Sequence, residues 1–302
     1  MTTGAGGTTY RVCTSEKSYV LKLAKEDAMN HPRLEPTVCA VLRSNGINTL
    51  CFVPSKDGEY STLLDGYIAN LYEYVEGDTV AHNSLSAEKV DECAALLAKI
   101  NVALQNMDLP MGLSQGFFDF MTPDRALQSY LQSLEKAREI KDAEIIRSIE
   151  NRIELLPYIH GWQFDCAKLT FCNSHGDYTN NQLILQGECV HIIDFTCCCR
   201  QPVVWELTRF FFHADKTAKD GAFDEKRYRE YLRNYTSIVR LTDYDLDNAY
   251  KLYFYQILVC DYYSQYLAEK DDIKKKDYLT QANFASKILN ANSELIKNAQ
   301  KG

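Results

Sequence analysis

Two acidic residues, Asp177 and Asp194, flank a short predicted β-hairpin in this chain. Residues 183–185 and 189–193 are largely apolar runs on either side of Gln186-Gly187-Glu188, which is typical of two strands joined by a tight turn. Because a hairpin brings its two ends together, we expect Asp177 to lie close to Asp194. Two carboxylates at one place repel each other unless a cation or a proton lies between them. The pattern therefore predicts a site at which a divalent metal ion holds phosphate.

The length and charge of the chain narrow the class of protein. Its 302 residues are enough for one large domain or for two lobes with a sizeable core. The formal charge of −8 argues against nucleic acid as a partner. It would suit a cationic small molecule, although most such charge is solvated surface. No apolar run reaches the roughly 18 residues of a membrane span, so we expect no membrane contact.

The cysteines and the start of the sequence indicate a compartment. The first residues carry neither the basic nor the apolar region of a secretory signal. The 11 cysteines have no regular spacing, which favours free thiols in a reducing cytosol, and we expect a cytoplasmic protein. Cys197-Cys198-Cys199 suggests a metal site, but adjacent residues cannot easily direct three thiolates at one ion. Buried free thiols are therefore favoured there.

Residues 1–77 are predicted to form a small strand-rich lobe. Apolar patterns predict one helix over residues 34–44 and strands over residues 8–12, 18–23, 50–54 and 68–75. A glycine-rich start such as this one exposes backbone N–H groups that can approach phosphate oxygens, although it is more often a frayed terminus. Lys22 lies inside the second strand, where a lysine on its own more often points to water. Glu35 at the helix start could pair with Lys22 or simply favour the positive end of the helix dipole.

Residues 78–302 are predicted to form a larger, mainly helical lobe, because the apolar spacing becomes helical after residue 78. Ser86 and Thr122 are suitable N-caps for two of its helices. Further helical patterns cover residues 129–156, 203–213, 224–239, 243–266 and 274–297. The helix over residues 243–266 would carry an aromatic stripe, more often core packing than a ligand site, formed by Tyr255, Tyr262 and Tyr266.

Two short motifs resemble those of a known family, as does the order of a strand-rich lobe followed by a helical lobe. The motifs are Ser174-His175-Gly176-Asp177 and Ile193-Asp194-Phe195, joined by a hairpin of suitable length. They are similar to those of the aminoglycoside phosphotransferase/choline kinase family, which includes homoserine-kinase-like and spore-coat-associated members. Residues 202–207, with their Pro, Trp and Glu-Leu, add to the resemblance. It implies an α+β fold, a bilobal protein-kinase-like structure with a small antiparallel-sheet N-lobe and a mainly helical C-lobe.

The resemblance also implies a phosphotransferase that moves the γ-phosphoryl group of ATP, or of GTP, to a hydroxyl of a small molecule. Asp177 would be the catalytic base, His175 would brace its loop, and Asp194 would bind Mg²⁺. The family usually has Asn five residues after the catalytic Asp as a second metal ligand, and here that residue is Gln182. Its extra methylene moves the amide oxygen by about one C–C bond. Asn181 could replace it only if the loop turned differently, because neighbours on a strand face opposite ways.

For the nucleotide, the resemblance assigns Lys22 to the α- and β-phosphates and Glu35 to holding Lys22. The backbone of Glu73-Tyr74-Val75 would bind the purine edge. Gly6 and Gly7 are the candidates for the phosphate-binding loop. The family usually has a strand before these glycines, and in this sequence that strand looks missing or trimmed.

Other functions stay open. Gln182 and the short start also fit a catalytically weak or inactive relative that binds a nucleotide or a partner as a scaffold, and a metal-dependent hydrolase is a third possibility. The acceptor could be an amino alcohol such as choline or ethanolamine, homoserine, a sugar or an aminoglycoside. A cationic acceptor predicts further carboxylates near Asp177. The candidates for such an acceptor site are Glu206, Asp215 and the pair Tyr262-Tyr263. The sequence does not indicate an oligomeric state.

Overall fold

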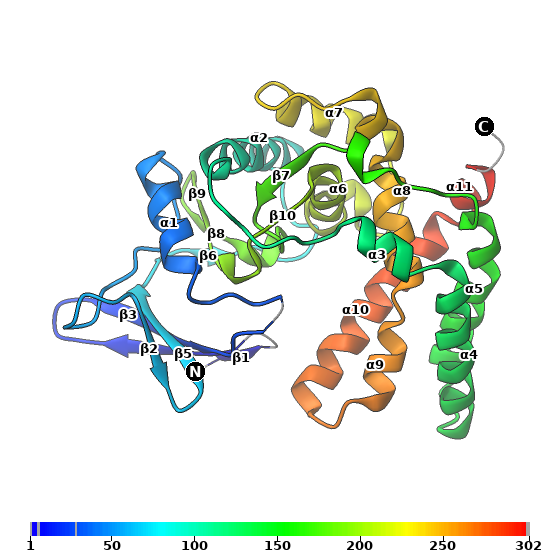
Figure 1. Cartoon of the computed structure of the whole chain (residues 1–302), viewed down its shortest axis with the longest axis horizontal. Coiled ribbons are helices and arrows are strands. Elements are labelled where there is room, and N and C mark those ends of the chain that lie inside the picture. Colours follow the sequence, from blue (N-terminus) through cyan, green and yellow to red (C-terminus); the bar gives the residue numbers. More distant parts are fainter. Residues whose placement is uncertain (1, 5–6, 28, 300–302) are drawn as a thin grey trace.

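The first part of the chain folds into an antiparallel sheet, drawn in blue and cyan in Figure 1. The computed structural model describes residues 2–4, 7–27 and 29–299. Within these residues the sheet has the strand order β1-β2-β3-β5-β4. Its strands are β1 Thr2–Gly4, β2 Gly7–Cys13, β3 Ser18–Ala24, β4 Ser61–Leu64 and β5 Tyr67–Glu73.

Strand alternation directs one face of this sheet toward the helices. Thr9, Lys22 and Asn70 are cross-strand partners in β2, β3 and β5, so they share a face. The Lys22 residue is only 6% exposed. The lysine therefore points inward, contrary to the orientation favoured for an isolated strand lysine.

Helix α1, Glu35–Ser44, follows the third strand as predicted. Val38, Cys39 and Leu42 recur at helical spacing and are fully buried, and α1 packs against α2, Ala87–Leu104. Pro36 lies in the first turn of α1, where its missing N–H removes no helical hydrogen bond. This packing places Glu35 at the inner face of the sheet.

The predicted hairpin is present as β8, Leu183–Gln186, and β9, Cys189–Ile192. Strand β6, Asp78–Thr79, pairs with β8 and completes a small sheet in the order β6-β8-β9. The Thr49 hydroxyl donates to the Ile192 carbonyl at 2.6 Å. This bond ties the segment after α1 to the hairpin, and so fixes the first sheet against the rest of the chain.

A second ribbon aligns the two motif-bearing loops. Strand β7, Phe171–Ser174, pairs with β10, Cys199–Pro202, and Ser174 lies opposite Cys199. The loop after β7 and the loop before β10 therefore run side by side, with the β8–β9 hairpin at their other end. Asp177 lies on the first loop and Asp194 on the second.

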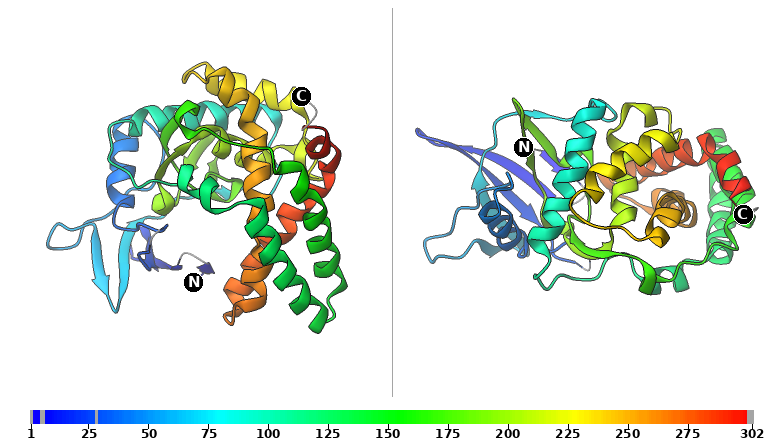
Figure 2. Two further views of the ribbon diagram at one scale, coloured as in Figure 1. Left: turned by 45° about the vertical axis from the view of Figure 1, so that its right-hand side comes forward. Right: turned by 90° about the horizontal axis from the view of Figure 1, so that it is seen from above.

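The remaining elements are mainly helical. They are α3 Gln115–Phe120, α4 Pro123–Glu139, α5 Ala143–Ile159, α6 Val203–Ala214, α7 Glu225–Thr236, α8 Asp243–Val259, α9 Tyr262–Ala268, α10 Asp272–Ala291 and α11 Ser293–Asn298. Ser86 and Thr122 cap α2 and α4 through their side chains, as predicted. Figures 1 and 2 show the first sheet and α1 on one side of the molecule and α4 and α5 on the opposite side. None of the described helices is long and apolar enough to cross a membrane.

The single helix predicted over residues 243–266 is wrong. Helix α8 ends at Val259 and α9 begins at Tyr262. Between them, Asp261 caps α9 and accepts hydrogen bonds from the hydroxyls of Ser129 and Ser133, both at 2.7 Å. These bonds turn the chain, so Tyr255 lies on a different helix from the other two tyrosines and the predicted stripe does not form.

Three further expectations are corrected. Residues 50–54 form no strand in the described chain, and Phe52 makes only an isolated bridge to Tyr72, whereas β4 was not predicted. The helix predicted over residues 274–297 is divided at Asn292 into α10 and α11. The strand before the glycines, expected to be missing or trimmed, is not missing but is short: it is the three-residue β1, whose Thr2 pairs with Thr9.

Candidate active site

The structure places Asp177 and Asp194 on the two adjacent loops, where both lie near the thiol of Cys197. Their side chains are 33% and 39% exposed, so both reach solvent. Both carboxylates also act on the thiol of Cys197. Burial, with the negative charges of Asp177 and Asp194, raises the pKa of Cys197 to about 12, so this thiol stays protonated at neutral pH.

Asp194 is held in an unusual backbone conformation. Its φ of 65° and ψ of 63° are left-handed, which is uncommon outside glycine but best tolerated by Asp and Asn. Its Oδ1 accepts hydrogen bonds from Lys22 Nζ and from the Thr196 hydroxyl, both at 2.7 Å. Burial raises the pKa of Asp194, but Lys22 and Thr196 outweigh that effect and hold the pKa below its usual range. Asp194 is therefore ionised at neutral pH.

Lys22 joins Asp194 to Glu35. Its Nζ lies 3.4 Å from Glu35 Oε2, and the Phe195 N–H donates to Glu35 Oε1 at 3.1 Å. Complete burial raises the pKa of Glu35 to about 7, although Lys22 acts to lower it. Burial lowers the pKa of Lys22, but the two carboxylates raise it further, so the net direction is upward. A charged lysine thus connects the sheet to the loop that carries Asp194.

Asp177 has a different partner for each of its oxygens. Arg209 Nη1, on α6, lies 2.5 Å from Oδ1. Gln182 Nε2 donates to Oδ2 at 2.8 Å. A carboxylate can only accept, so the nitrogen of the Gln182 amide must face Asp177, and its oxygen points elsewhere. Asn181, the alternative to Gln182, is exposed and bonds instead to Asn180, so the loop does not bring it into the site.

His175 is fully buried beneath the loop. Its Nε2 lies 2.9 Å from the Ile193 carbonyl, and its Nδ1 lies 3.2 Å from the N–H of Asp177. A carbonyl can only accept and an amide N–H can only donate, so both bonds form with a neutral ring protonated at Nε2. In this state His175 links the two loops and has no free nitrogen for proton transfer.

Three neighbours hold the start of the loop rigidly. Gly176 has a φ of 84°, and an added Cβ would collide with the Cys197 carbonyl. Buried Glu206 accepts hydrogen bonds from the Ser174 hydroxyl and from the Tyr178 N–H. The side chain of Asn101 donates to the Ser174 hydroxyl at 3.0 Å, a contact that could not be predicted from the residues around Asn101.

The side chains named for a cationic acceptor do not all reach the cleft. Glu206 is 0% and Asp215 1% exposed, and Asp215 pairs with Arg227 at 2.8 Å. Tyr263 is also fully buried. These three support the fold and cannot meet an acceptor, because each is sealed from solvent and each already has polar partners.

Asp277 on α10 is a carboxylate near Asp177 that the sequence did not reveal. Burial raises its pKa, a hydrogen bond from Gln281 lowers it, and the charge of Asp177 raises it further, with a net upward direction. Asp277 is only partly buried. The surroundings of Asp177 thus contain both a further acid, as a cationic acceptor predicts, and the basic Arg209.

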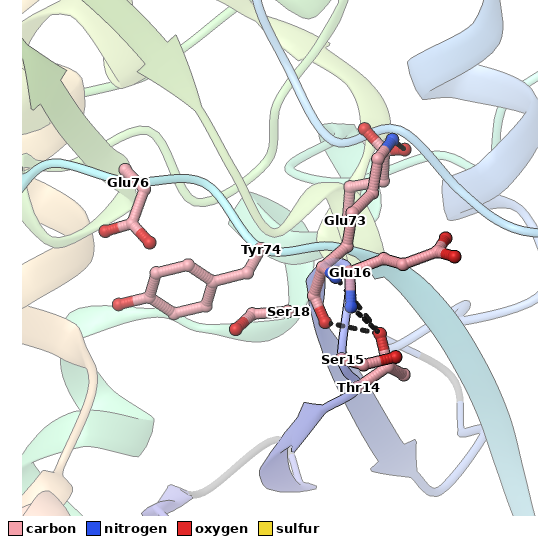
Figure 3. A pocket seen from close by; sticks show the side chains of 8 residues that line it. Thr14, Ser15, Glu16, Ser18, Glu73, Tyr74 and Glu76 are labelled. Carbon is pink, nitrogen blue, oxygen red and sulfur yellow. Dashed lines mark hydrogen bonds and ion pairs between the residues drawn. The ribbon is translucent and has the colours of Figure 1, made fainter.

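The predicted purine-binding segment Glu73-Tyr74-Val75 follows the end of β5. The side chain of Glu73 pairs with Lys17 at 2.8 Å and faces outward, and the Tyr74 N–H donates to the Ser18 carbonyl. In the described part of the chain, the Val75 N–H has no hydrogen-bond acceptor. A hollow of about 390 Å³ lies here. Figure 3 shows the side chains that line it, with Tyr74 and Glu76 on one side and the turn of residues 14–18 on the other. This hollow adjoins the segment and does not include Lys22 or Asp194.

Of the two glycines proposed for the phosphate loop, Gly7 begins β2 and Gly6 lies outside the described residues. Gly7 has a φ of 153°, and an added Cβ would lie too close to the carbonyl of Leu23. Glycine is therefore required at position 7 by the packing of β2 on β3, independently of any ligand.

A buried lysine and a buried glutamate, Lys22 and Glu35, face two loops that each carry an aspartate. This arrangement defines a kinase-like phosphotransferase of small-molecule type. The chain matches the model of the Phosphotransferase enzyme family (APH) over residues 2–241, and it belongs to that family. The family, the fold class and the phosphotransferase class predicted from two motifs are therefore confirmed. No curated protein matches the sequence significantly.

Solved structures share the fold at low identity. A spectinomycin phosphotransferase, APH(9)-Ia, in complex with ADP and spectinomycin is 15% identical with a TM-score of 0.60, covering 100% of this chain and 92% of that one. The amicoumacin kinase hAmiN, in complex with AMP-PNP, Ca²⁺ and Ami, is 13% identical with a TM-score of 0.64, covering 96% of this chain and 87% of that one. The choline kinase LicA of Streptococcus pneumoniae is 14% identical with a TM-score of 0.52, covering 92% and 89%.

Proposed function

We propose that this chain transfers the γ-phosphoryl group of ATP to a hydroxyl group of a small molecule. The observation that carries the proposal is the position of Lys22 Nζ, 3.4 Å from buried Glu35 and 2.7 Å from partly exposed Asp194. Glu35 fixes the ammonium, which suits it to the α- and β-phosphates. Asp177 lies partly exposed on the adjoining loop, where an acceptor can reach it.

Asp194 and Gln182 are the residues that would hold Mg²⁺. Asp194 offers a partly exposed carboxylate, and the amide oxygen of Gln182 remains for a cation because its nitrogen faces Asp177. Carboxylate and amide oxygens with retained waters are the donors that Mg²⁺ prefers. When bound, such an ion would offset the charge of the phosphates.

In this proposal Asp177 orients the acceptor hydroxyl and accepts its proton, and His175 keeps the loop in place. Phosphoryl transfer depends mainly on such positioning and on charge stabilisation. The backbone of Glu73-Tyr74-Val75 would bind the purine edge, and Gly6 and Gly7 would lie near the phosphates. The N-lobe of residues 1–77 would bind the nucleotide, and residues 78–302 would supply the base and the acceptor site.

A catalytically weak scaffold is the second candidate, favoured by one observation. Both oxygens of Asp177 already have partners, Arg209 at 2.5 Å and Gln182 at 2.8 Å, which restrains the proposed base. Thermal unfolding with ATP, with and without Mg²⁺, followed by ADP release over a panel of hydroxyl compounds, separates the candidates. An active kinase shows Mg²⁺-dependent stabilisation that disappears in Asp194→Ala, together with turnover. Stabilisation without turnover supports the scaffold, and no response to ATP and Mg²⁺ contradicts both.

A further inference from the structure

Arg209 is a fixed cation beside the proposed base. Its side chain is 23% exposed and its Nη1 lies 2.5 Å from Asp177 Oδ1. It follows Glu206 by less than one turn of α6, and Glu206 anchors the loop that carries Asp177. The guanidinium also lies 5.7 Å from the ring of Trp205, within the range of a cation–π contact. Arg209 is therefore held in place and partly open to solvent.

The two oxygens of Asp177 have different partners, and these partners indicate on which side of the site Arg209 lies. Oδ2 faces the side chain of Gln182. The main-chain carbonyl of Gln182 accepts from the N–H of Ile193 at 2.9 Å, next to the proposed metal ligand Asp194. Oδ1 faces Arg209 on α6 instead. The metal and the phosphates are assigned to the first side, so Arg209 lies on the side left for the acceptor.

The other surroundings of Arg209 belong to the helical part of the chain. Tyr253 of α8 and Tyr262 of α9 are close enough to influence its charge electrostatically. The indole N–H of Trp205 is buried and has no acceptor among the described residues. Asp177 is the carboxylate that directly contacts Arg209 in the described chain.

Asp177 engages only part of the Arg209 guanidinium. Nη1 lies against Oδ1, whereas Nε and Nη2 have no acceptor in the described part of the chain. A guanidinium has five donors in a planar fork that matches two oxygens of an oxyanion. We infer that the acceptor carries an anionic group, a carboxylate in the simplest case, close to the hydroxyl that is phosphorylated, and that Arg209 binds this group. The inference rests on the proposed function and narrows its acceptor.

Matched pairs of acceptors test the inference. Glycerate and glycerol, serine and serinol, and homoserine and homoserinol differ only in a carboxylate or a hydroxymethyl group. ADP release with ATP and Mg²⁺ is measured for each pair in the wild type and in Arg209→Met, Arg209→Lys and the control Arg229→Met. Arg229 is an exposed residue on α7 that pairs with Glu225, away from the site.

We expect the wild type to favour the carboxylate member of at least one pair. In Arg209→Met the KM for that acceptor should rise roughly 10- to 1000-fold, as for the loss of one partner of a charge pair, while the KM for ATP stays unchanged. Arg209→Lys should lie between, because it keeps the charge and loses the planar fork. If Arg209 instead binds the transferring phosphoryl group, kcat falls equally for both members of each pair, and the inference is wrong.

Calorimetric binding of ATP and Mg²⁺ to the same proteins separates this inference from the proposed function. A wild type that binds ATP and Mg²⁺, and that phosphorylates serinol or glycerol as well as the acids or phosphorylates no carboxylate at all, overturns the inference and leaves nucleotide binding intact. A wild type that does not bind ATP and Mg²⁺ overturns both. Unchanged ATP binding in Arg209→Met also shows that the variant is folded, so a change in acceptor preference cannot be attributed to unfolding.

Discussion

Lys22 Nζ lies 2.7 Å from Asp194 Oδ1 and thereby joins the inner face of the sheet to the end of the hairpin. Replacing Lys22 by Met leaves Glu35, which is fully buried, without its cation. We expect this change to lower the free energy of unfolding by about 3 kcal/mol, because an unpaired buried charge is costly. The double variant Lys22→Met/Glu35→Gln should recover part of the loss. Urea unfolding measures both, and a single variant as stable as the wild type would contradict the expected coupling.

The raised pKa of Glu35 predicts a pH dependence of stability. Burial raises this pKa from 4.5 to about 7, so between these values the folded chain binds a proton that the unfolded chain releases. The contribution of Glu35 to stability is thus fully present below pH 4.5 and is lost as the pH rises to about 7. Urea unfolding across this range should show the wild type losing stability relative to Glu35→Gln. A constant difference between the two proteins would contradict the prediction.

Two glycines with positive φ provide a matched test of the loop. Gly187 lies in an open turn with a φ of 59° and no atom near an added Cβ, whereas at Gly176 a Cβ would collide with the Cys197 carbonyl. Gly187→Ala should cost about 1 kcal/mol for the backbone conformation alone. Gly176→Ala should cost about 3 kcal/mol or more, because the clash adds to the same strain. Denaturant unfolding compares them, and equal losses would show that the loop yields easily.

Gln182 predicts a magnesium requirement that depends on its amide oxygen. Gln182→Ala removes that oxygen and also the hydrogen bond to Asp177. We expect the Mg²⁺ concentration for half-maximal ADP release to rise about 10-fold, with Gln182→Asn in between. Asn181→Ala is the control, because Asn181 is the exposed neighbour. If Gln182→Ala needs no more Mg²⁺ for half-maximal ADP release than Asn181→Ala, Gln182 is not a metal ligand and only positions Asp177.

Short-range signals explain what the sequence predicted well. Ser86 and Thr122 cap their helices through bonds to the backbone three residues later, and the hairpin depends on two apolar runs and a turn with Gly187. The two motifs lie at the ends of that hairpin, so their meeting followed from local geometry. The fold class and the enzyme class could thus be predicted without knowledge of distant contacts.

Contacts between distant elements could not be predicted. Arg209 meets Asp177 only because α6 lies beneath the loop, and nothing in the residues around Arg209 fixes that placement. The break before α9 arises from hydrogen bonds between Asp261 and two serines of α4, 132 and 128 residues away. Glu206 is one candidate for the acceptor site in the sequence, because a carboxylate there carries no sign of its burial. Packing decides where each acidic side chain lies, and only its position shows whether it supports the fold or belongs to the site.

Asp277 predicts a preference for an amino group on the acceptor. Its raised pKa reports burial and the nearby charge of Asp177, so a positive group between them would be stabilised by both. We expect Asp277→Asn to raise the KM for serine about 10-fold and to leave the KM for glycerate, which has no amino group, unchanged or lower. The control is Asp272→Asn, an exposed residue in the first turn of the same helix. Equal changes for serine and glycerate would show that Asp277 acts on the site as a whole and does not recognise an ammonium group.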